Sequence, residues 1–238
     1  MRVWFWALAA GLAVSAAEPP ADLARRLALR ESASEAERAN YAYTQTVTME
    51  EFGERGKVGG AYREVREIIF SPDGERSEKL VGSPQNNLRR LIMTPEDFSD
   101  LRDIQPLLLT TERLRLYDIQ SKGEETLENT VCWVLQVRPR QILYGQRLFE
   151  GTFWVDQRDY SIIRSQGRAV PQMLSSRTGK ENLFPWFTTV REKVGEFWFP
   201  IYTHADDTLH FTSGPIRIRL AVRYRDYKRF SAESRIVP

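Results

Sequence analysis

The sequence predicts an α+β protein that is mostly β, with one large, curved antiparallel sheet and helices packed against its apolar face. Two observations predict this class. The segment 215–230 alternates apolar and arginine residues, and a period of two is typical of a strand with one dry and one wet face. The expected elements run in the order helix, strands, short helix, many strands, without a repeat at a propeller or solenoid period. That order favours a single antiparallel sheet covered by helices.

Residues 1–17 are typical of a secretory signal peptide. Arg2 supplies a positive start, VWFWALAAGLAV is an apolar core, and SAAEPP supplies small residues before a polar, proline-marked segment. The alternative is a transmembrane anchor, but the apolar run is shorter than the ~20 residues that a span needs, and no basic flank follows it. We therefore expect cleavage after Ala17, export to a bacterial periplasm, and a single mature domain at 18–238.

The composition limits the partners. Lys plus Arg (34) and Asp plus Glu (32) nearly cancel, which argues against nucleic acid or an acidic polymer as a partner. Hydrophobic residues make up 42% of the chain, enough for a folded core. Cys132 is the only cysteine, so no internal disulfide can form, which suits a bacterial envelope protein. Because Cys132 lies in the strand-like run TVCWVLQV, we expect it to be buried and unreactive.

The first two elements are a helix and a strand. The segment 21–40 predicts an amphipathic helix, because Leu23, Leu27 and Ala28 lie along one face of a run of helix formers. The next run, 41–50, alternates in polarity and predicts a half-buried strand. Its inward-facing residues are expected to be Tyr41, Tyr43, Val47 and Met49.

The segment 66–81 predicts a β-hairpin. The tripeptide Pro-Asp-Gly at 72–74 separates two strand-like runs, and these residues favour a tight turn. The runs on either side should therefore pair as antiparallel strands.

A short helix is expected at 95–105. Thr94 can cap it, and Pro95 suits the first helical position. The acidic residues that follow suit the positive end of the helix dipole. Phe98 and Leu101 lie three residues apart and therefore share one side of the helix, which we expect to face the sheet.

Strands dominate the rest of the chain. The segments 123–139, 151–167 and 187–203 each predict strand, turn and strand, with the last turning at 194–196. In the first of these segments, the inward face is expected to be Val131, Trp133, Leu135 and Val137. In the final strand, the dry face is expected to be Ile216, Ile218, Leu220, Val222 and Tyr224. The wet face carries Arg217, Arg219, Arg223 and Arg225, either as a solvated surface or as a contact for anionic lipid headgroups or an acidic partner.

The sequence carries no familiar catalytic motif, such as a nucleophile elbow, a phosphate-binding glycine loop or C-x-x-C. One short run, HADDTLH, would place His204, Asp206 and His210 on one face if it formed a continuous strand, as a metal site needs. The adjacent aspartates favour a turn instead, so we expect a polar loop with two solvated histidines. We expect no metal and no cofactor.

The segment 171–188 predicts a loop rich in apolar residues. These side chains either pack beneath the loop or form an apolar rim or lid. They are Met173, Leu174, Leu183, Phe184, Trp186 and Phe187.

Two hairpin motifs carry a resemblance to a known superfamily. The runs GEETLENTVCWVLQVRP and FEGTFWVDQRDYSIIR, together with the order of signal peptide, helix, YAYTQTV strand and closing strands, resemble the LolA/LolB and RseB-type superfamily of periplasmic lipoprotein carriers and sensors. The resemblance implies an incomplete β-barrel wrapped around helices, with a hydrophobic cavity for acyl chains. It implies neither a cofactor nor catalysis.

The predicted function is that of a periplasmic carrier of lipid or lipoprotein acyl chains. It is expected to be a monomer, with envelope membrane proteins as further partners. The alternatives are a regulatory sensor of envelope lipid that acts through protein contacts, and a metal-dependent enzyme at His204, Asp206 and His210. The helix at 95–105 is expected to gate the cavity. The candidate cavity residues are Tyr43, Val47, Phe98, Leu101, Val131, Trp133, Leu135, Phe153, Val155, Ile218, Leu220 and Val222.

Overall fold

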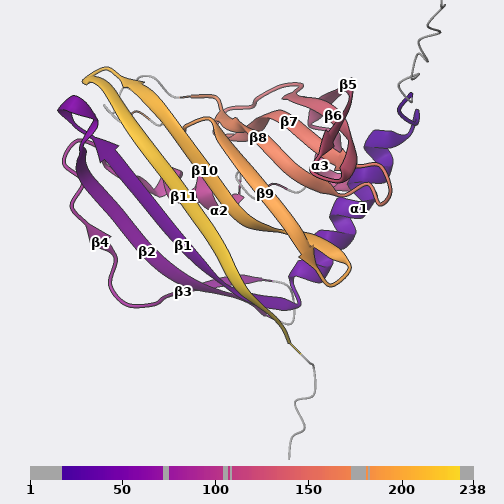
Figure 1. Cartoon of the computed structure of the whole chain (residues 1–238), viewed down its shortest axis with the longest axis horizontal. Coiled ribbons are helices and arrows are strands. Elements are labelled where there is room, and N and C mark those ends of the chain that lie inside the picture. The colour runs from indigo at the N-terminus through magenta and orange to yellow at the C-terminus, as the bar shows by residue number, and fades with distance from the viewer. Residues whose placement is uncertain are drawn as a thin grey trace, which may run out of the picture.

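The computed structural model is mostly β, as predicted. Within the residues that it describes, eleven strands form one antiparallel sheet that is not closed into a barrel (Figure 1). No helix in this part of the chain is long and apolar enough to cross a membrane. The expected signal peptide, the turn at 72–74, and Met173 and Leu174 lie outside it. The described residues are 18–71, 75–103, 107, 109–172, 181 and 183–230.

The elements divide into a few short helices and many strands. The helical segments are α1 (Leu23–Arg38), η1 (Glu54–Gly56), α2 (Pro95–Asp103) and α3 (Thr111–Leu114). The first strands are β1 (Tyr41–Phe52), β2 (Val58–Phe70), β3 (Arg76–Leu80), β4 (Gln85–Asn86), β5 (Tyr117–Leu127) and β6 (Thr130–Pro139). The remaining strands are β7 (Leu148–Asp156), β8 (Ile162–Val170), β9 (Phe187–Val194), β10 (Phe197–Phe211) and β11 (Gly214–Arg229).

The sheet joins two meanders. Its strand order is β3-β2-β1-β11-β10-β9-β8-β7-β6-β5, with the short β4 paired to β2. Strands β5 to β11 follow one another in space as they do along the chain, and β1 to β3 do the same. The two meanders meet where β1 lies antiparallel to β11, with Val47 opposite Val222. The first and last strands of the described chain therefore lie side by side (Figure 1).

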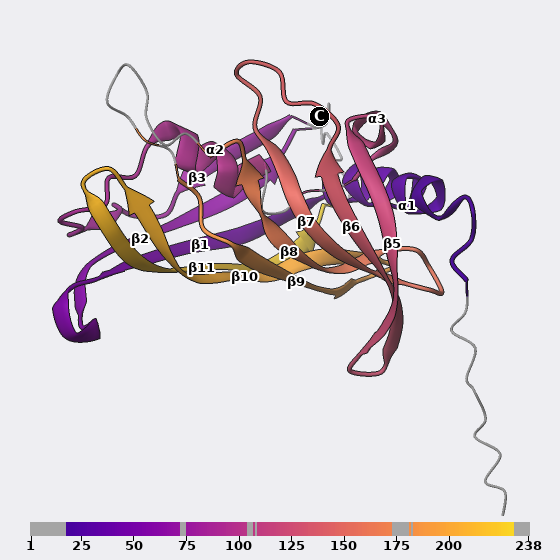
Figure 2. The same ribbon diagram turned by 90° about the horizontal axis from the view of Figure 1, so that it is seen from above.

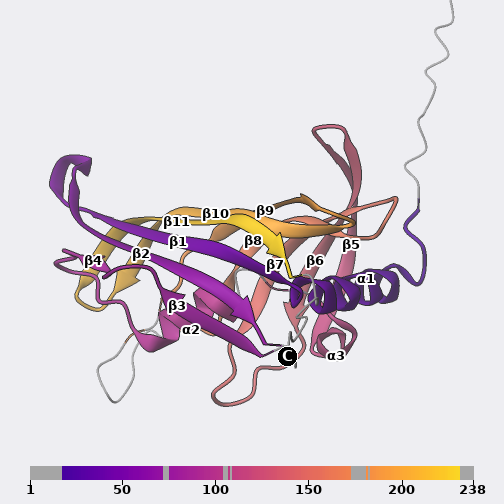
Figure 3. The same cartoon turned by 90° about the horizontal axis from the view of Figure 1, so that it is seen from below.

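The sheet curves, and the helices lie on its concave side (Figure 3). Strand β11 shows why this face is dry: its even-numbered residues from Ile216 to Tyr224 are all buried, whereas its arginines point outward into solvent. The inward-facing residues of β1 alternate in the same way. Together with side chains from α1 and α2, they form one large apolar core. The predicted dry and wet faces of these two strands are confirmed.

Helix α1 packs on the concave face through the residues that its periodicity predicts. Leu23, Leu27 and Ala28 are buried. The Thr111 backbone N–H donates a hydrogen bond of 3.0 Å to Ser32 Oγ, so α1 also holds the start of α3. The predicted N-terminal helix is therefore confirmed.

Helix α2 begins with the cap that the sequence predicts. Thr94 Oγ1 accepts a hydrogen bond from the Asp97 N–H at 3.2 Å, and Asp97 Oδ2 accepts one from the Thr94 N–H at 2.7 Å. This reciprocal pair is a capping box with aspartate at its third position. Leu101 is buried in the core, and Phe98 packs against it while staying partly exposed.

The run HADDTLH was expected to be a polar loop, and this prediction is wrong. It lies within the continuous strand β10, with Asp206 opposite Arg219 and Asp207 opposite Ile218 on β11. The aspartates fit a strand because Asp206 faces the arginines of β11, which neutralise it. Pairing with the neighbouring strand therefore outweighs the turn propensity of the two aspartates.

Strand β6 does not have the single dry face that was predicted: Val131 is exposed, and the opposite face also carries a buried residue, Cys132. Val131 is 43% exposed, because it stands near the start of the strand, beyond the edge of the core. Cys132 is buried as predicted, but in a second, small apolar cluster formed with Trp154 and Ile163. Burial raises the pKa of the Cys132 thiol to about 11, which makes it a poor nucleophile at neutral pH.

Candidate functional site

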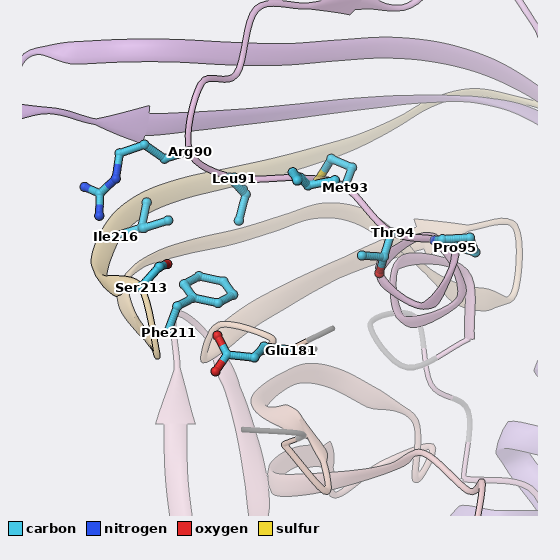
Figure 4. A pocket seen from close by; sticks show the side chains of 10 residues that line it. Arg90, Leu91, Met93, Thr94, Pro95, Glu181, Phe211, Ser213 and Ile216 are labelled. Carbon is cyan, nitrogen blue, oxygen red and sulfur yellow. The ribbon is translucent and has the colours of Figure 1, made fainter. Parts of the chain in front are cut away.

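A pocket of 360 Å³ opens beside the turn between β10 and β11 (Figure 4). One wall is the segment that leads from β4 to α2, and the opposite wall is the β10–β11 hairpin. Leu91, Phe211 and Ile216 point toward one another across it (Figure 4). Leu91 and Ile216 also belong to the main core, so the pocket is continuous with the dry face of the sheet.

Glu51 holds the first wall in place. Its buried carboxylate accepts hydrogen bonds from the backbone N–H groups of Arg89 at 2.6 Å, Arg90 at 3.0 Å and Leu91 at 2.8 Å. Burial alone would raise the pKa of Glu51, but these three donors and the charge of Arg90 outweigh it and lower the pKa below its ordinary value. A single anion therefore fixes three consecutive residues of the wall.

Gly60 on β2 lets this wall approach the sheet. A Cβ atom at this position would lie 2.7 Å from the Asn87 carbonyl oxygen and 2.9 Å from Leu88 Cα. The Asn87 N–H donates to the Ala61 carbonyl at 2.9 Å, which continues the pairing of β4 with β2. Only glycine leaves room for so close a contact between the two backbones.

The second wall is fixed by polar contacts at the rim. Glu181 accepts hydrogen bonds from the Thr212 N–H at 3.0 and 2.9 Å, and Arg90 donates one of 3.0 Å to the Pro215 carbonyl. Both charged side chains are therefore engaged with the turn between β10 and β11. The inside of the pocket is left to apolar side chains.

The start of α2 completes the pocket. Thr94 and Pro95 line it, so the capping box lies at its edge (Figure 4). Burial raises the pKa of Asp97 to about 6, although the two hydrogen bonds from Thr94 oppose this shift. Phe98 stands over Tyr62 with 6.0 Å between ring centroids.

The opposite end of the concave face is closed by a buried ion pair. Arg191 on β9 and Glu31 on α1 are both fully buried, with 2.9 Å between Nη1 and Oε2. Arg191 also donates to the Leu107 carbonyl at 2.6 Å, and the Ile162 N–H donates to Glu31 Oε1 at 3.2 Å. This network ties α1 to β8, to β9 and to the chain after α2.

The predicted cavity residues are brought together, but as a packed core. Leu101 and most of the others are buried in one cluster, Phe98 lies at its edge, and Val131 lies outside it. None of the twelve lines the pocket of Figure 4. The members of the cluster are Tyr43, Val47, Leu101, Trp133, Leu135, Phe153, Val155, Ile218, Leu220 and Val222.

The pocket residues were missed for an identifiable reason. Ile216 was predicted to face inward, but the run Leu91-Ile92-Met93 has no strand or helix periodicity. Its position directly before the capping box of α2 was the available signal, since an apolar residue there often packs against the helix. Glu51, which shapes the wall, gave no signal in an otherwise ordinary strand pattern.

The metal hypothesis finds no support among the described residues. There, no group of three or more His, Cys, Asp or Glu side chains is placed to hold a metal ion. Asp206 pairs instead with Arg217 at 3.1 Å and with Arg219 at 3.2 Å. The hydrogen bond from Arg217 is the main cause of the lowered pKa of Asp206.

No family model and no curated protein matches the chain. Among solved structures, it is similar to a DUF1329 family protein from Desulfovibrio piger, with 12% identity, 90% of this chain and 92% of that chain covered, and a TM-score of 0.38. It is similar to a LolA superfamily protein from Nitrosomonas europaea, with 14% identity, coverage of 86% and 96%, and a TM-score of 0.33. It is also similar to a putative outer membrane lipoprotein-sorting protein domain from Vibrio parahaemolyticus, with 11% identity, coverage of 89% and 95%, and a TM-score of 0.36.

Proposed function

We propose that this protein binds acyl chains of lipids or lipoproteins and carries them through the periplasm as a single domain, residues 18–238. The observation that carries the proposal is the apolar pocket of 360 Å³ that continues into the dry concave face. Its volume lies within the range of small-molecule sites. The charged groups at its rim are already engaged, so the interior favours an apolar ligand.

The energetics suit such a ligand. Each methylene removed from water contributes ~0.8 kcal/mol, so a long acyl chain represents on the order of 10 kcal/mol of burial. A carrier therefore needs a dry concave wall rather than catalytic groups. The pocket offers a way in, since Ile92 at its rim is 80% exposed and Met93 beside it is half-buried.

The wall from Arg90 to Thr94 and helix α2 form the proposed gate. The wall and the helix are joined at the capping box, and backbone hydrogen bonds from Arg90 and Leu91 to Glu51 hold the wall in position. Deeper entry of a chain requires the core side chains behind Leu91 to move apart. The predicted cavity residues that belong to the core cluster would then line the enlarged space.

The test uses residues 18–238 exported to a bacterial periplasm and purified without detergent. Bound lipid is extracted with organic solvent and identified by mass spectrometry. The carrier hypothesis predicts stoichiometric acyl lipid or lipopeptide, with a strong loss in Met93→Asp, because a carboxylate placed in the pocket opposes apolar binding.

Val131→Asp is the matched control, since it places the same charge on an exposed apolar position far from the pocket. It should retain lipid. A folded, lipid-free protein that takes up no fluorescent acyl probe would overturn the proposal.

A further inference from the structure

A second pocket, of 250 Å³, lies on the convex face, away from the helices. It forms beside the turn of the β5–β6 hairpin, which projects from the convex side of the sheet (Figures 2 and 3). Its walls come from the turn of that hairpin and from the outward faces of β8, β9 and β10. It is therefore separate from the pocket on the concave face.

The base of this pocket is apolar. Leu127, Ile163 and Trp198 line it, and all three belong to the small cluster around Cys132. An apolar cluster on the outer face of a sheet is unexpected when the core lies on the other face. Here the projecting hairpin covers the apolar cluster, which leaves a hollow with apolar walls next to the solvated surface of the sheet.

Arg164 brings a positive charge without an ion-pair partner to this hollow, which Glu128 of the hairpin turn also lines. Its guanidinium lies over the Trp154 ring, 4.7 Å from the centroid. Among the described residues it has no ion pair, and its buried Nε has no hydrogen-bond partner. Arg217 and Arg219 on the same face are both paired with carboxylates. Arg164 is thus available to an anion from outside the chain.

His204 faces Arg164 in the same pocket. Its imidazole stacks on Tyr202, with 5.3 Å between ring centroids and 17° between the planes. Burial, and then the charge of Arg164, lower the pKa of His204, which favours its neutral form. A neutral imidazole has one hydrogen-bond donor and one acceptor. Because it carries no charge, it does not compete with Arg164 for the anion.

We propose that this convex pocket binds an amphiphilic anion, a carboxylate or phosphate group joined to a short apolar moiety. Arg164 forms the ion pair with the anionic group, and Leu127, Ile163 and Trp198 hold the apolar part. The volume is smaller than that of a drug-sized site, which suits a small molecule or the head of a larger one. The site is independent of the proposed function, because the two pockets share no residue.

His204 is the reporter for the test. The chain has two histidines, so their imidazole NMR signals are assigned with His210→Gln. Titration of residues 18–238 with octanoate should shift the His204 signals saturably and raise the pKa of His204, because the bound carboxylate offsets the charge of Arg164. Arg164→Gln should weaken this binding by about tenfold or more, and Arg164→Lys should restore part of it.

Arg219→Gln is the matched control, since it removes an arginine from the same face outside the pocket, and it should bind like the wild type. Octanoate bound in the concave pocket should not shift the NMR signals of His204, because His204 lines only the convex pocket. The His204 signals therefore report binding at the convex pocket alone. No saturable shift in the folded protein, or an equal shift in Arg164→Gln, would overturn the proposal.

Vesicles distinguish the sources of the anion. If the ligand is a lipid headgroup, phosphatidylglycerol vesicles should sediment the wild type but not Arg164→Gln, and phosphatidylcholine vesicles should sediment neither. If the ligand is a free amphiphile, only octanoate should produce the Arg164-dependent effect. Either result supports an anion site, and binding that ignores Arg164 in both assays contradicts it.

Discussion

The two ends of the concave face are held by buried carboxylates that have very different partners. Glu31 at the α1 end meets the buried guanidinium of Arg191. Glu51 at the pocket end meets three backbone N–H groups of the wall that starts at Arg89. In Figure 1, α1 lies at the right and the β10–β11 turn at the upper left, at opposite ends of the sheet.

The two kinds of partner give the two carboxylates different structural roles: Glu31 fixes a helix rigidly, whereas Glu51 supports a loop that stays partly exposed. An ion pair without access to water is costly to break, so Glu31 and Arg191 fix the position of α1. Hydrogen bonds from a loop to one carboxylate hold a shape while the loop keeps its solvent-exposed side, as the exposure of Ile92 shows. The α1 end is therefore suited to stability, and the pocket end to admitting a ligand.

The largest expected effect is at the locked end. Arg191→Met should lower the free energy of unfolding by about 3–5 kcal/mol, because Glu31 then stays buried without its partner. Urea denaturation measures the change. The double variant Glu31→Leu/Arg191→Met should lose less than Arg191→Met alone, since it leaves no buried charge. A single-variant loss below about 1 kcal/mol would contradict the role of the pair.

At the pocket end, Glu51→Gln should cost about 1–3 kcal/mol, since its amide replaces an acceptor oxygen with a donor facing other donors. Because folding lowers the pKa of Glu51, its stabilisation is present above pH 4.5 and is lost as pH falls through the lowered value. Urea unfolding of wild type and variant at pH 7 and pH 3 measures this. The difference between the two proteins should shrink at pH 3, and a constant difference would contradict the charge as its cause.

A smaller effect is expected at the start of α2. Because burial raises the folded pKa of Asp97 to about 6, the protein should lose stability as pH rises from 4 toward 6, where the unfolded chain is already ionised. The loss should be about 1 kcal/mol, since solvent screens a partly exposed carboxylate. Asp97→Asn keeps the acceptor for Thr94 and should flatten this part of the curve, as followed by hydrogen exchange of α2. An unchanged slope in the variant would assign the pH dependence to another group.

The smallest effect is expected on the convex face. Arg217→Gln removes an exposed ion pair with Asp206 and should leave the urea midpoint unchanged, because such pairs contribute little in water. A measurable loss would mean that the convex surface is more tightly coupled to the core than its exposure indicates.

Much of the local structure could be predicted from the sequence. The even-numbered apolar residues of β11 and the alternation of β1 identify the dry face, because side chains of a strand alternate between two sides. The capping box at Thr94 identifies the start of α2. The candidate site could be predicted only in part: its dry face was expected, whereas the wall at 91–93 has no periodicity.

The sequence by itself determined most of the strands and helices and the apolar faces of β1, β11 and α1, since these follow from short-range periodicity and capping. Only the tertiary structure decided that β1 lies against β11, that HADDTLH stays in a strand, and that Arg191 meets Glu31. The same holds for the pocket, whose wall depends on contacts between Glu51 and residues 89–91. The physical reason is that pairing between segments distant in sequence depends on the free energy of the whole assembled sheet, which no local pattern records.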